Sequence, residues 1–375
     1  MLSISARQNT VTTETSRQQP TETTQALRNL PKVELHRHLE GSLRIETLLS
    51  IAMEYDITLP SVTAETLRPY VQLMPDEPRS MQQFLSKFAI LRQFYRSEAI
   101  IKRVTREVIA DAAEDNIRYM ELRFTPKALN NIVNRDYQEV ISWVCEAAKE
   151  AAEANNIKVG LIVAMNRHES LDIALNAFEA ALALRGQGIV GVDLAGQEAN
   201  YPVSLFRVLF ERARAEGLGI TIHAGEWAGP DSVRSAVEIG ATRIGHGIRT
   251  IEDPDLVQML VEKGIVLEVC PSSNVDSGAV ASLKEHPLEK LYTAGVRTTI
   301  NTDDPLISGI TLSDEFARVL NATSLTLNDL KRMQILASRA AFLPSSERTA
   351  LAAQFEAWFF PPPTRPLRPQ DFAQA

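Results

Sequence analysis

Eight short apolar runs alternate with longer amphipathic stretches along most of the chain. The runs are rich in valine, isoleucine and leucine, which is typical of strands that are covered on both faces of a sheet. They lie at positions 33–38, 118–124, 158–164, 189–195, 219–223, 242–246, 265–270 and 297–302. Because strand and helix alternate eight times, the pattern predicts an α/β fold, a parallel (β/α)8 TIM barrel.

The stretches between the runs carry helical periodicity. Within 97–116, apolar side chains recur at positions 100, 101, 104, 108 and 109, which form one face of a helix. Further helices are expected at 137–154, 171–184, 202–216, 231–239 and 253–263. The long gap at 43–114, after the first strand, must hold extra helices that flank the barrel mouth. Three more helices are expected at the C-terminal end, at 312–320, 327–340 and 345–358.

The alternating pattern indicates a single barrel domain over residues 29–360. Residues 1–28 are rich in threonine, serine and glutamine and cannot bury enough apolar surface to offset the entropy of ordering, so we expect a disordered N-terminal extension. A transit peptide fits less well, because Glu14 and Glu22 break the acid-poor pattern of such peptides. The proline-rich tail, residues 361–375, is expected to be extended.

Composition narrows the classes of function. The formal net charge of -8 argues against a protein that binds nucleic acid through its phosphates. No apolar run approaches the roughly 18 residues of a membrane span. Only two cysteines occur, Cys145 and Cys270, so neither a disulfide framework nor a thiolate metal cage is expected, and a cytoplasmic location fits best.

Polar residues that can bind a metal ion or transfer a proton gather at the ends of the predicted strands. In a parallel barrel this is the end that carries the active site. The first strand ends in His36 and His38, whose side chains share one face because side chains alternate along a strand. Four of the six histidines and an aspartate pair lie at strand ends: His36, His38, His223, His246, Asp303 and Asp304.

These residues offer nitrogen and oxygen donors without cysteine. Three neutral imidazoles and one carboxylate suit Zn²⁺ or a similar divalent ion, with a position left for water. Binuclear barrel hydrolases commonly carry a bridging lysine at the end of the fourth strand; residues 192–198 contain none, so one metal ion per chain is expected. His223 and His246 could instead be hydrogen-bonded core histidines, but their positions at strand ends favour a role in metal binding or catalysis.

Five motifs together resemble those of the adenosine deaminases. They are His36-Arg-His-Leu-Glu-Gly41, Asp193-Leu-Ala-Gly-Gln-Glu198, His223-Ala-Gly-Glu226, Gly245-His246-Gly247 and Asn301-Thr-Asp-Asp-Pro305. The paired histidines alone are weakly specific, whereas the third motif followed by the fifth is strongly specific. The resemblance runs from about residue 30 to 360, in the family's order. It implies hydrolytic deamination of adenosine and 2′-deoxyadenosine to inosine and deoxyinosine, with release of ammonia.

The resemblance also implies roles for the catalytic groups. A single Zn²⁺ would be held by His36, His38, His223 and Asp303, and would activate water for attack on purine C6. His246 would orient or deprotonate that water. Glu226 would carry a proton to ring N1, which requires a pKa raised by burial. The alternative for Glu226 is a cap on the following loop.

Further residues are implied on the substrate side. Asp304 would bond N7, and Gly196 would offer its backbone N–H to N3. Glu40 stands where the family often has an aspartate that contacts the ribose 5′-hydroxyl, and His38 also borders the substrate. Three residues on one predicted helical face would line the entrance: Phe84, Leu85 and Phe88. The alternative for these three is an ordinary packed helix face.

Glu268 shares its strand parity with Cys270 and would lie beside the sixth strand if it points inward. We hypothesise that it hydrogen-bonds His246 and fixes the tautomer of that ring. A barrel-interior charge that pairs elsewhere fits the sequence equally well.

Two other functions compete with a nucleoside deaminase. An adenine deaminase would share the metal site and act on the free base. A non-catalytic barrel that binds nucleosides would be expected to have lost a ligand or Glu226, and all are intact. A relative specific for nucleotides would need a basic phosphate pocket, and no cluster of that kind is evident. The expected partner is therefore a small purine nucleoside; the oligomeric state is left open.

Overall fold

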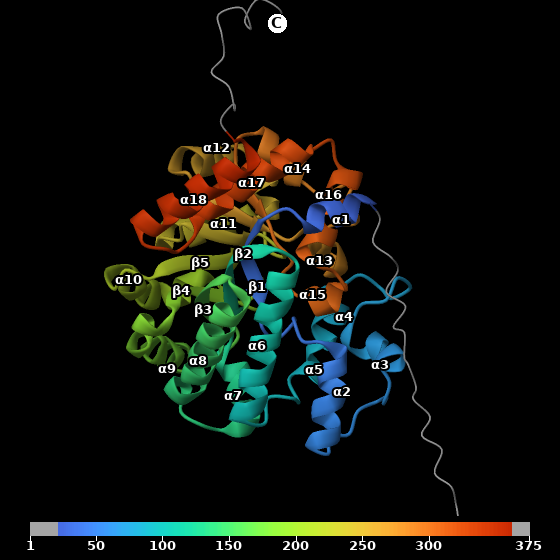
Figure 1. The fold of residues 1–375 in the computed structure, drawn as a ribbon. Coiled ribbons are helices and arrows are strands. Elements are labelled where there is room, and N and C mark those ends of the chain that lie inside the picture. The colour runs from blue at the N-terminus through green and yellow to red at the C-terminus, as the bar shows by residue number, and fades with distance from the viewer. Residues whose placement is uncertain (1–21, 362–375) are drawn as a thin grey trace, which may run out of the picture.

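The computed structural model describes residues 22–361. Its eight strands pair in parallel and in chain order, β1 with β2 through to β8 (Figure 1). Backbone hydrogen bonds from His38 to Asp303 and from Asp303 to His36 close the ring between β1 and the end of β8. The predicted (β/α)8 barrel is confirmed. The strands are β1 Lys32–His38, β2 Ile117–Phe124, β3 Lys158–Asn166, β4 Ile189–Ala195, β5 Gly219–Ala224, β6 Arg243–His246, β7 Val266–Val269 and β8 Arg297–Ile300.

Helices follow the strands on the outside of the barrel. They are α6 Glu98–Glu114, α7 Pro126–Val133, α8 Tyr137–Asn155, α9 Leu171–Ala183, α10 Arg207–Ala215, α11 Pro230–Ile239, α12 Pro254–Lys263, α13 Pro271–Asp276 and α14 Leu288–Thr293. Helices α6 and α8 to α12 lie close to the expected bounds, whereas α7, α13 and α14 were not predicted. The expected helix at 202–216 begins as a 3-10 turn, η2 Val203–Phe206, because the buried Val203 and Phe206 stand at the three-residue spacing of such a turn. Two further 3-10 turns are η1 Arg185–Gln187 and η3 Ile248–Glu252.

Extra helices lie within 43–114 and at the C-terminal end, as predicted. After β1 come α2 Ile45–Glu54, α3 Ala64–Val71, α4 Met81–Ser86 and α5 Phe88–Leu91; after β8 come α15 Pro305–Ser308, α16 Leu312–Ala322, α17 Leu327–Ala340 and α18 Ser345–Phe359. The short helix α15, which follows β8 directly, was not predicted. The first group lies beside α15 (Figure 1), to which Leu73 is tied by a backbone hydrogen bond to Ile307 of 2.8 Å. In the second group, α17 and α18 pack on each other and cover the base of β1.

The N-terminal prediction is partly wrong. Residues Glu22–Arg28 form helix α1 within the extension that was expected to be disordered. Leu27 is buried in the main core, and Arg28 accepts a hydrogen bond from the Lys32 ammonium through its carbonyl. The burial of Leu27 therefore orders a segment whose average composition predicts disorder. The rest of the extension, 1–21, and the tail at 362–375 lie outside the described residues.

The barrel interior is filled with paired charges below the strand ends. Arg123 bonds Glu268 at 2.7 Å and Asp193 at 3.1 Å, and Arg243 bonds Glu268 at 2.6 Å and also Glu121. Buried charges are stable only when they are paired in this way. The apolar core consequently lies between the strands and the outer helices. Among residues 22–361, no helix is long and apolar enough to cross a membrane.

Candidate metal centre and active site

The four predicted metal ligands converge at the carboxyl end of the barrel. His36 and His38 end β1, His223 lies on β5, and Asp303 follows β8. The Nε2 atoms of His38 and His223 are 3.2 Å apart, and Asp303 Oδ1 lies 3.1 Å from His36 Nε2 and 3.3 Å from His38 Nε2. One donor atom from each of the four falls within 4.8 Å of the others. His36 and Asp303, which are 267 positions apart in the sequence, thus belong to one cluster.

Two carboxylates orient two of these imidazoles. Glu268 lies 2.9 Å from His36 Nδ1, and Asp193 lies 3.0 Å from His223 Nδ1. Burial opposes ionisation of Glu268, but Arg123 and Arg243 outweigh it and hold the pKa of that carboxyl well below its ordinary value. An ionised carboxylate can only accept, so Nδ1 of each ring carries the proton and Nε2 presents a lone pair to the cluster.

The lone pairs at the centre of the cluster fit a divalent cation. His36 Nε2 and Asp303 Oδ1 are buried and have no hydrogen-bond partner within the described part of the chain. Buried acceptors that face one another are costly unless a cation lies between them. Burial lowers the pKa of His223 to about 4, which keeps the ring in the neutral form that binds metals. The donor set of three imidazoles and one carboxylate is one that Zn²⁺ accepts.

Two side chains of the site stand on unusual backbone. His246 has a φ of 62° and Asp303 a φ of 64°, in the left-handed region that residues other than glycine rarely adopt. Such conformations persist only where the surrounding structure holds them, and they cluster at functional sites.

Glu226 and His246 lie next to the four ligands. Glu226 Oε2 is 3.5 Å from His246 Nε2, and its Oε1 accepts from the Ser277 hydroxyl at 3.2 Å. Burial, reinforced by the negative charges of Asp303 and Glu198, raises the pKa of Glu226 well above its ordinary value. The arrangement suits a carboxyl group that holds a proton at neutral pH.

The proposed bond between Glu268 and His246 is wrong. In the paired strands Glu268 lies opposite Gly245, and a Cβ at Gly245 would come 3.0 Å from the His36 ring. The missing side chain makes room for His36, which is the histidine that Glu268 bonds. His246 Nδ1 instead meets the side-chain amide of Asn274 at 3.0 Å.

The roles of several contributing residues do not follow from the sequence. Asp193 and Glu198 lie within the motif at 193–198, which does not show what either carboxylate bonds. Glu198 accepts the backbone N–H groups of four consecutive residues, 225–228, and so fixes the loop that carries Glu226. Ser273 bonds Asp303 Oδ2 at 2.6 Å. A carboxylate two residues after Gly196, close to a strand end, was the available signal for Glu198.

On the expected substrate side, two buried carboxyl groups have spare oxygens. Glu40 Oε1 accepts the Thr125 N–H at 2.6 Å, while Glu40 Oε2 and Asp304 Oδ1 have no partner among residues 22–361. A Cβ at Gly41 would lie 1.7 Å from Asp304 Oδ1, so only glycine allows that carboxyl its position. Gly196 has a φ of 90°, which likewise favours glycine.

The three predicted entrance residues do not share one continuous helix. The chain breaks between α4 and α5 at Lys87, whose ammonium is bound by Glu77 at 2.6 Å and by the Pro69 carbonyl at 2.7 Å. Phe84 and Phe88 still meet, with ring centroids 6.4 Å apart, whereas Leu85 is 41% exposed. The single helical face is therefore wrong for Leu85, and the entrance role itself stays a prediction.

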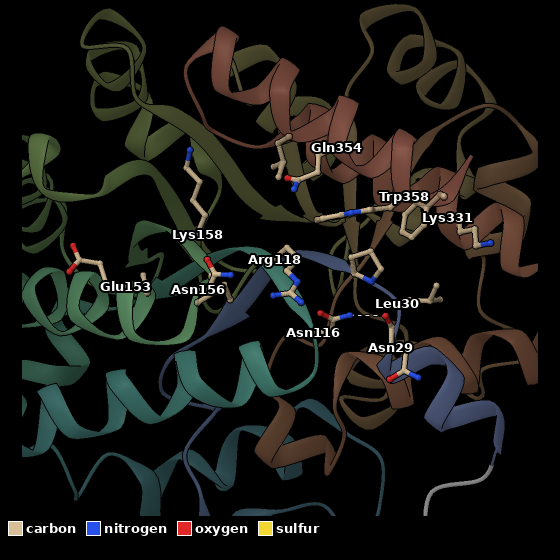
Figure 2. A pocket seen from close by; sticks show the side chains of 15 residues that line it. Asn29, Leu30, Asn116, Arg118, Glu153, Asn156, Lys158, Lys331, Gln354 and Trp358 are labelled. Carbon is tan, nitrogen blue, oxygen red and sulfur yellow. Dashed lines mark hydrogen bonds between the residues drawn. The ribbon is translucent and has the colours of Figure 1, made fainter. Parts of the chain in front are cut away.

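A cavity of about 920 Å³ lies at the opposite end of the barrel, near the start of β2 and β3 and against α18. Figure 2 shows Arg118, Lys158 and Trp358 among the side chains that line it. None of the predicted site residues belongs to this cavity. The predicted metal ligands therefore lie away from this cavity, at the carboxyl ends of the strands.

Comparison with known proteins agrees with this geometry. The model of the adenosine deaminase family matches residues 31–358. An adenosine deaminase from Erwinia tasmaniensis is 38% identical over 329 residues, covering 88% of this chain and 98% of the relative. The crystal structure of an adenine deaminase from Arthrobacter aurescens has a TM-score of 0.81 at 29% identity, covering 88% of this chain and 99% of that one. An N6-methyl-AMP deaminase from Arabidopsis thaliana has a TM-score of 0.78 at 26% identity, covering 89% and 98%.

Proposed function

Because this chain belongs to the adenosine deaminase family, we propose that it hydrolyses adenosine and 2′-deoxyadenosine to inosine and deoxyinosine with release of ammonia. The observation that carries the proposal is the convergence of His36, His38, His223 and Asp303 beside the buried carboxyl group of Glu226, whose pKa is raised by burial. A cytoplasmic location is supported by the two cysteines, both buried and free in the described chain.

We propose that the four converging residues hold one Zn²⁺ per chain. When bound, such an ion lowers the pKa of water from about 15.7 toward 7 and so makes a nucleophile available at neutral pH. The chain's own contribution is orientation: Glu268 and Asp193 fix the rings of His36 and His223 with their Nε2 lone pairs toward the centre.

The purine ring would be bound by groups that surround this centre. Glu226 delivers a proton to N1, supported by its raised pKa and by the loop that Glu198 fixes. Asp304 donates a hydrogen bond from its carboxyl group to N7, which carries a lone pair and no proton. Its buried, unpartnered Oδ1 supports this role, as do burial and the charge of Asp303, which raise the pKa of Asp304 well above its ordinary value. Gly196 offers its backbone N–H to N3, supported by its φ of 90°, a backbone conformation that glycine adopts without strain.

The sugar and the entrance involve the helices after β1. Glu40 contacts the ribose 5′-hydroxyl through its free Oε2, which is buried and has no other partner in the described residues. His38 borders the same side. Phe84 and Phe88 line the way in, with Leu85 exposed at the rim.

Turnover on adenosine, adenine and AMP, measured side by side with zinc-loaded protein, tests the proposed substrate. We expect adenosine and 2′-deoxyadenosine to be preferred in kcat/KM. A strong preference for adenine would replace the nucleoside with the free base, and a preference for AMP would indicate a nucleotide enzyme. Absence of turnover on all of them would favour a non-catalytic barrel.

A further inference from the structure

Outside the metal ligands, a buried chain of hydrogen bonds leads from the backbone of α14 to His246. We propose that Asn274 and His286 are positioning residues that fix the neutral tautomer of His246, with its proton on Nε2 and facing the reacting atoms. The catalytic consequence rests on the proposed function; the assignment of the proton does not. All three side chains are buried, so water does not compete for their hydrogen bonds.

The series of hydrogen bonds begins at a backbone N–H group, which can act only as a donor. The backbone N–H of Leu288 donates to His286 Nδ1 at 3.1 Å. A backbone amide can only donate, so Nδ1 must be the unprotonated nitrogen of that ring. Burial lowers the pKa of His286 to about 3, so the ring is neutral and its single proton is on Nε2.

The next link fixes the orientation of an amide. His286 Nε2 lies 3.1 Å from Asn274 Oδ1, so its N–H donates to that oxygen. The Asn274 amide nitrogen is then the group that faces His246 Nδ1, at 3.0 Å. An amide N–H₂ group can only donate, so His246 Nδ1 accepts.

The proton of the neutral His246 ring is therefore on Nε2. This atom lies 3.5 Å from Glu226 Oε2 and 3.9 Å from Asp303 Oδ2, at the centre of the candidate active site. A ring that presents N–H to the reacting atoms can donate a hydrogen bond but cannot remove a proton. We call the hydrogen bonds from the Leu288 N–H through His286 and Asn274 to His246 the relay. The family resemblance implies that His246 either orients or deprotonates the attacking water, and the relay favours orientation.

The choice of partner separates His246 from the ligand histidines. Carboxylates accept from Nδ1 of His36 and His223, which turns an Nε2 lone pair toward the metal position. An amide donates to Nδ1 of His246, which turns an Nε2 proton toward the same region. His246 also clusters with Cys270 and Asp303 at metal-ligand spacing, and the relay argues against its use as a ligand.

Asn274→Asp tests the relay, because a carboxylate at that position accepts from both neighbouring rings. We expect the His246 proton to move to Nδ1, which the ¹⁵N shifts of histidine-labelled, zinc-loaded protein report directly. We expect kcat on adenosine to fall by about 10²-fold, the effect of losing one positioned donor, with KM and zinc content little changed. Asn155→Asp, the same exchange near the end of α8 and at the other end of the barrel, is the matched control and should leave kcat and the spectra unchanged.

A second variant guards against a merely structural effect. His286→Gln keeps an N–H donor toward Asn274 and an acceptor toward Leu288, so it should retain the Nε2 proton on His246 and most of kcat. A wild-type ¹⁵N spectrum with the His246 proton on Nδ1 would overturn the relay, as would an Asn274→Asp variant with unchanged kcat. If wild type failed to deaminate adenosine but showed the Nε2 proton, the proposed function would fail and the relay would stand.

Discussion

The carboxyl group of Glu226 lies in a buried site of like charge. Asp303 and Glu198 add their negative charges to the effect of burial, and all three raise the pKa of Glu226. Glu198 is nevertheless indispensable to the geometry, since it binds the backbone N–H groups on either side of Glu226. One residue thus both holds the loop and favours the protonated form that the proposed reaction needs.

Replacement of Glu226 by glutamine tests this role at the residue scale. Glutamine keeps the size and the hydrogen bond to Ser277 but cannot transfer a proton. We expect kcat on adenosine to fall by about 10² to 10⁴-fold, with KM changed little. Glu179→Gln, on the exposed surface of α9, is the control and should keep wild-type kcat. Wild-type kcat in Glu226→Gln would exclude Glu226 as the proton donor.

Between elements, α16 holds the start of α13, the helix that carries Asn274 and ends just before Ser277. Glu315 on α16 accepts the Ser272 backbone N–H at 2.7 Å and also the Ser272 hydroxyl. Burial raises the pKa of Glu315 to about 7, from an ordinary value of 4.5. The folded protein therefore keeps a proton on Glu315 that the unfolded chain releases above pH 4.5.

This difference gives stability a defined pH dependence. Where the folded state binds more protons than the unfolded state, stability falls as pH rises, here between about pH 4.5 and pH 7. The contribution is on the order of 3 kcal/mol at most. We expect melting temperatures measured at pH 5 and pH 8 to differ more in wild type than in Glu315→Gln. Equal pH dependence in the two proteins would refute the raised pKa.

At this scale the sequence predicted the strands better than the connections. The strand runs and the longer outer helices follow from local periodicity, and their bounds agree to within a few residues, whereas the short helices α7, α13 and α14 were not predicted. The break between α4 and α5 at Lys87 does not follow from local periodicity. It depends on Glu77 and the Pro69 carbonyl, which both bind the Lys87 ammonium group. Helix α1 depends on the burial of Leu27 by distant elements, which no local pattern records.

Across the whole molecule, the barrel explains why the metal centre was predictable and its supports were not. Strand ends in a parallel barrel meet at one rim, so His36, His223 and Asp303 could be grouped from the sequence alone. Partners across the barrel interior depend on which side chains fill it. Gly245 decides that Glu268 bonds His36, and the loop 225–228 decides the role of Glu198.

In the proposed function, His36, His38, His223 and Asp303 form one metal centre. Zinc content of wild type and Asp303→Ala, purified without chelator, tests it most directly, with Asp255→Ala on the exposed face of α12 as the control. We predict one zinc per chain in wild type and in the control, and a loss of most of that zinc in Asp303→Ala. Unchanged zinc in Asp303→Ala would rule out this set of four ligands.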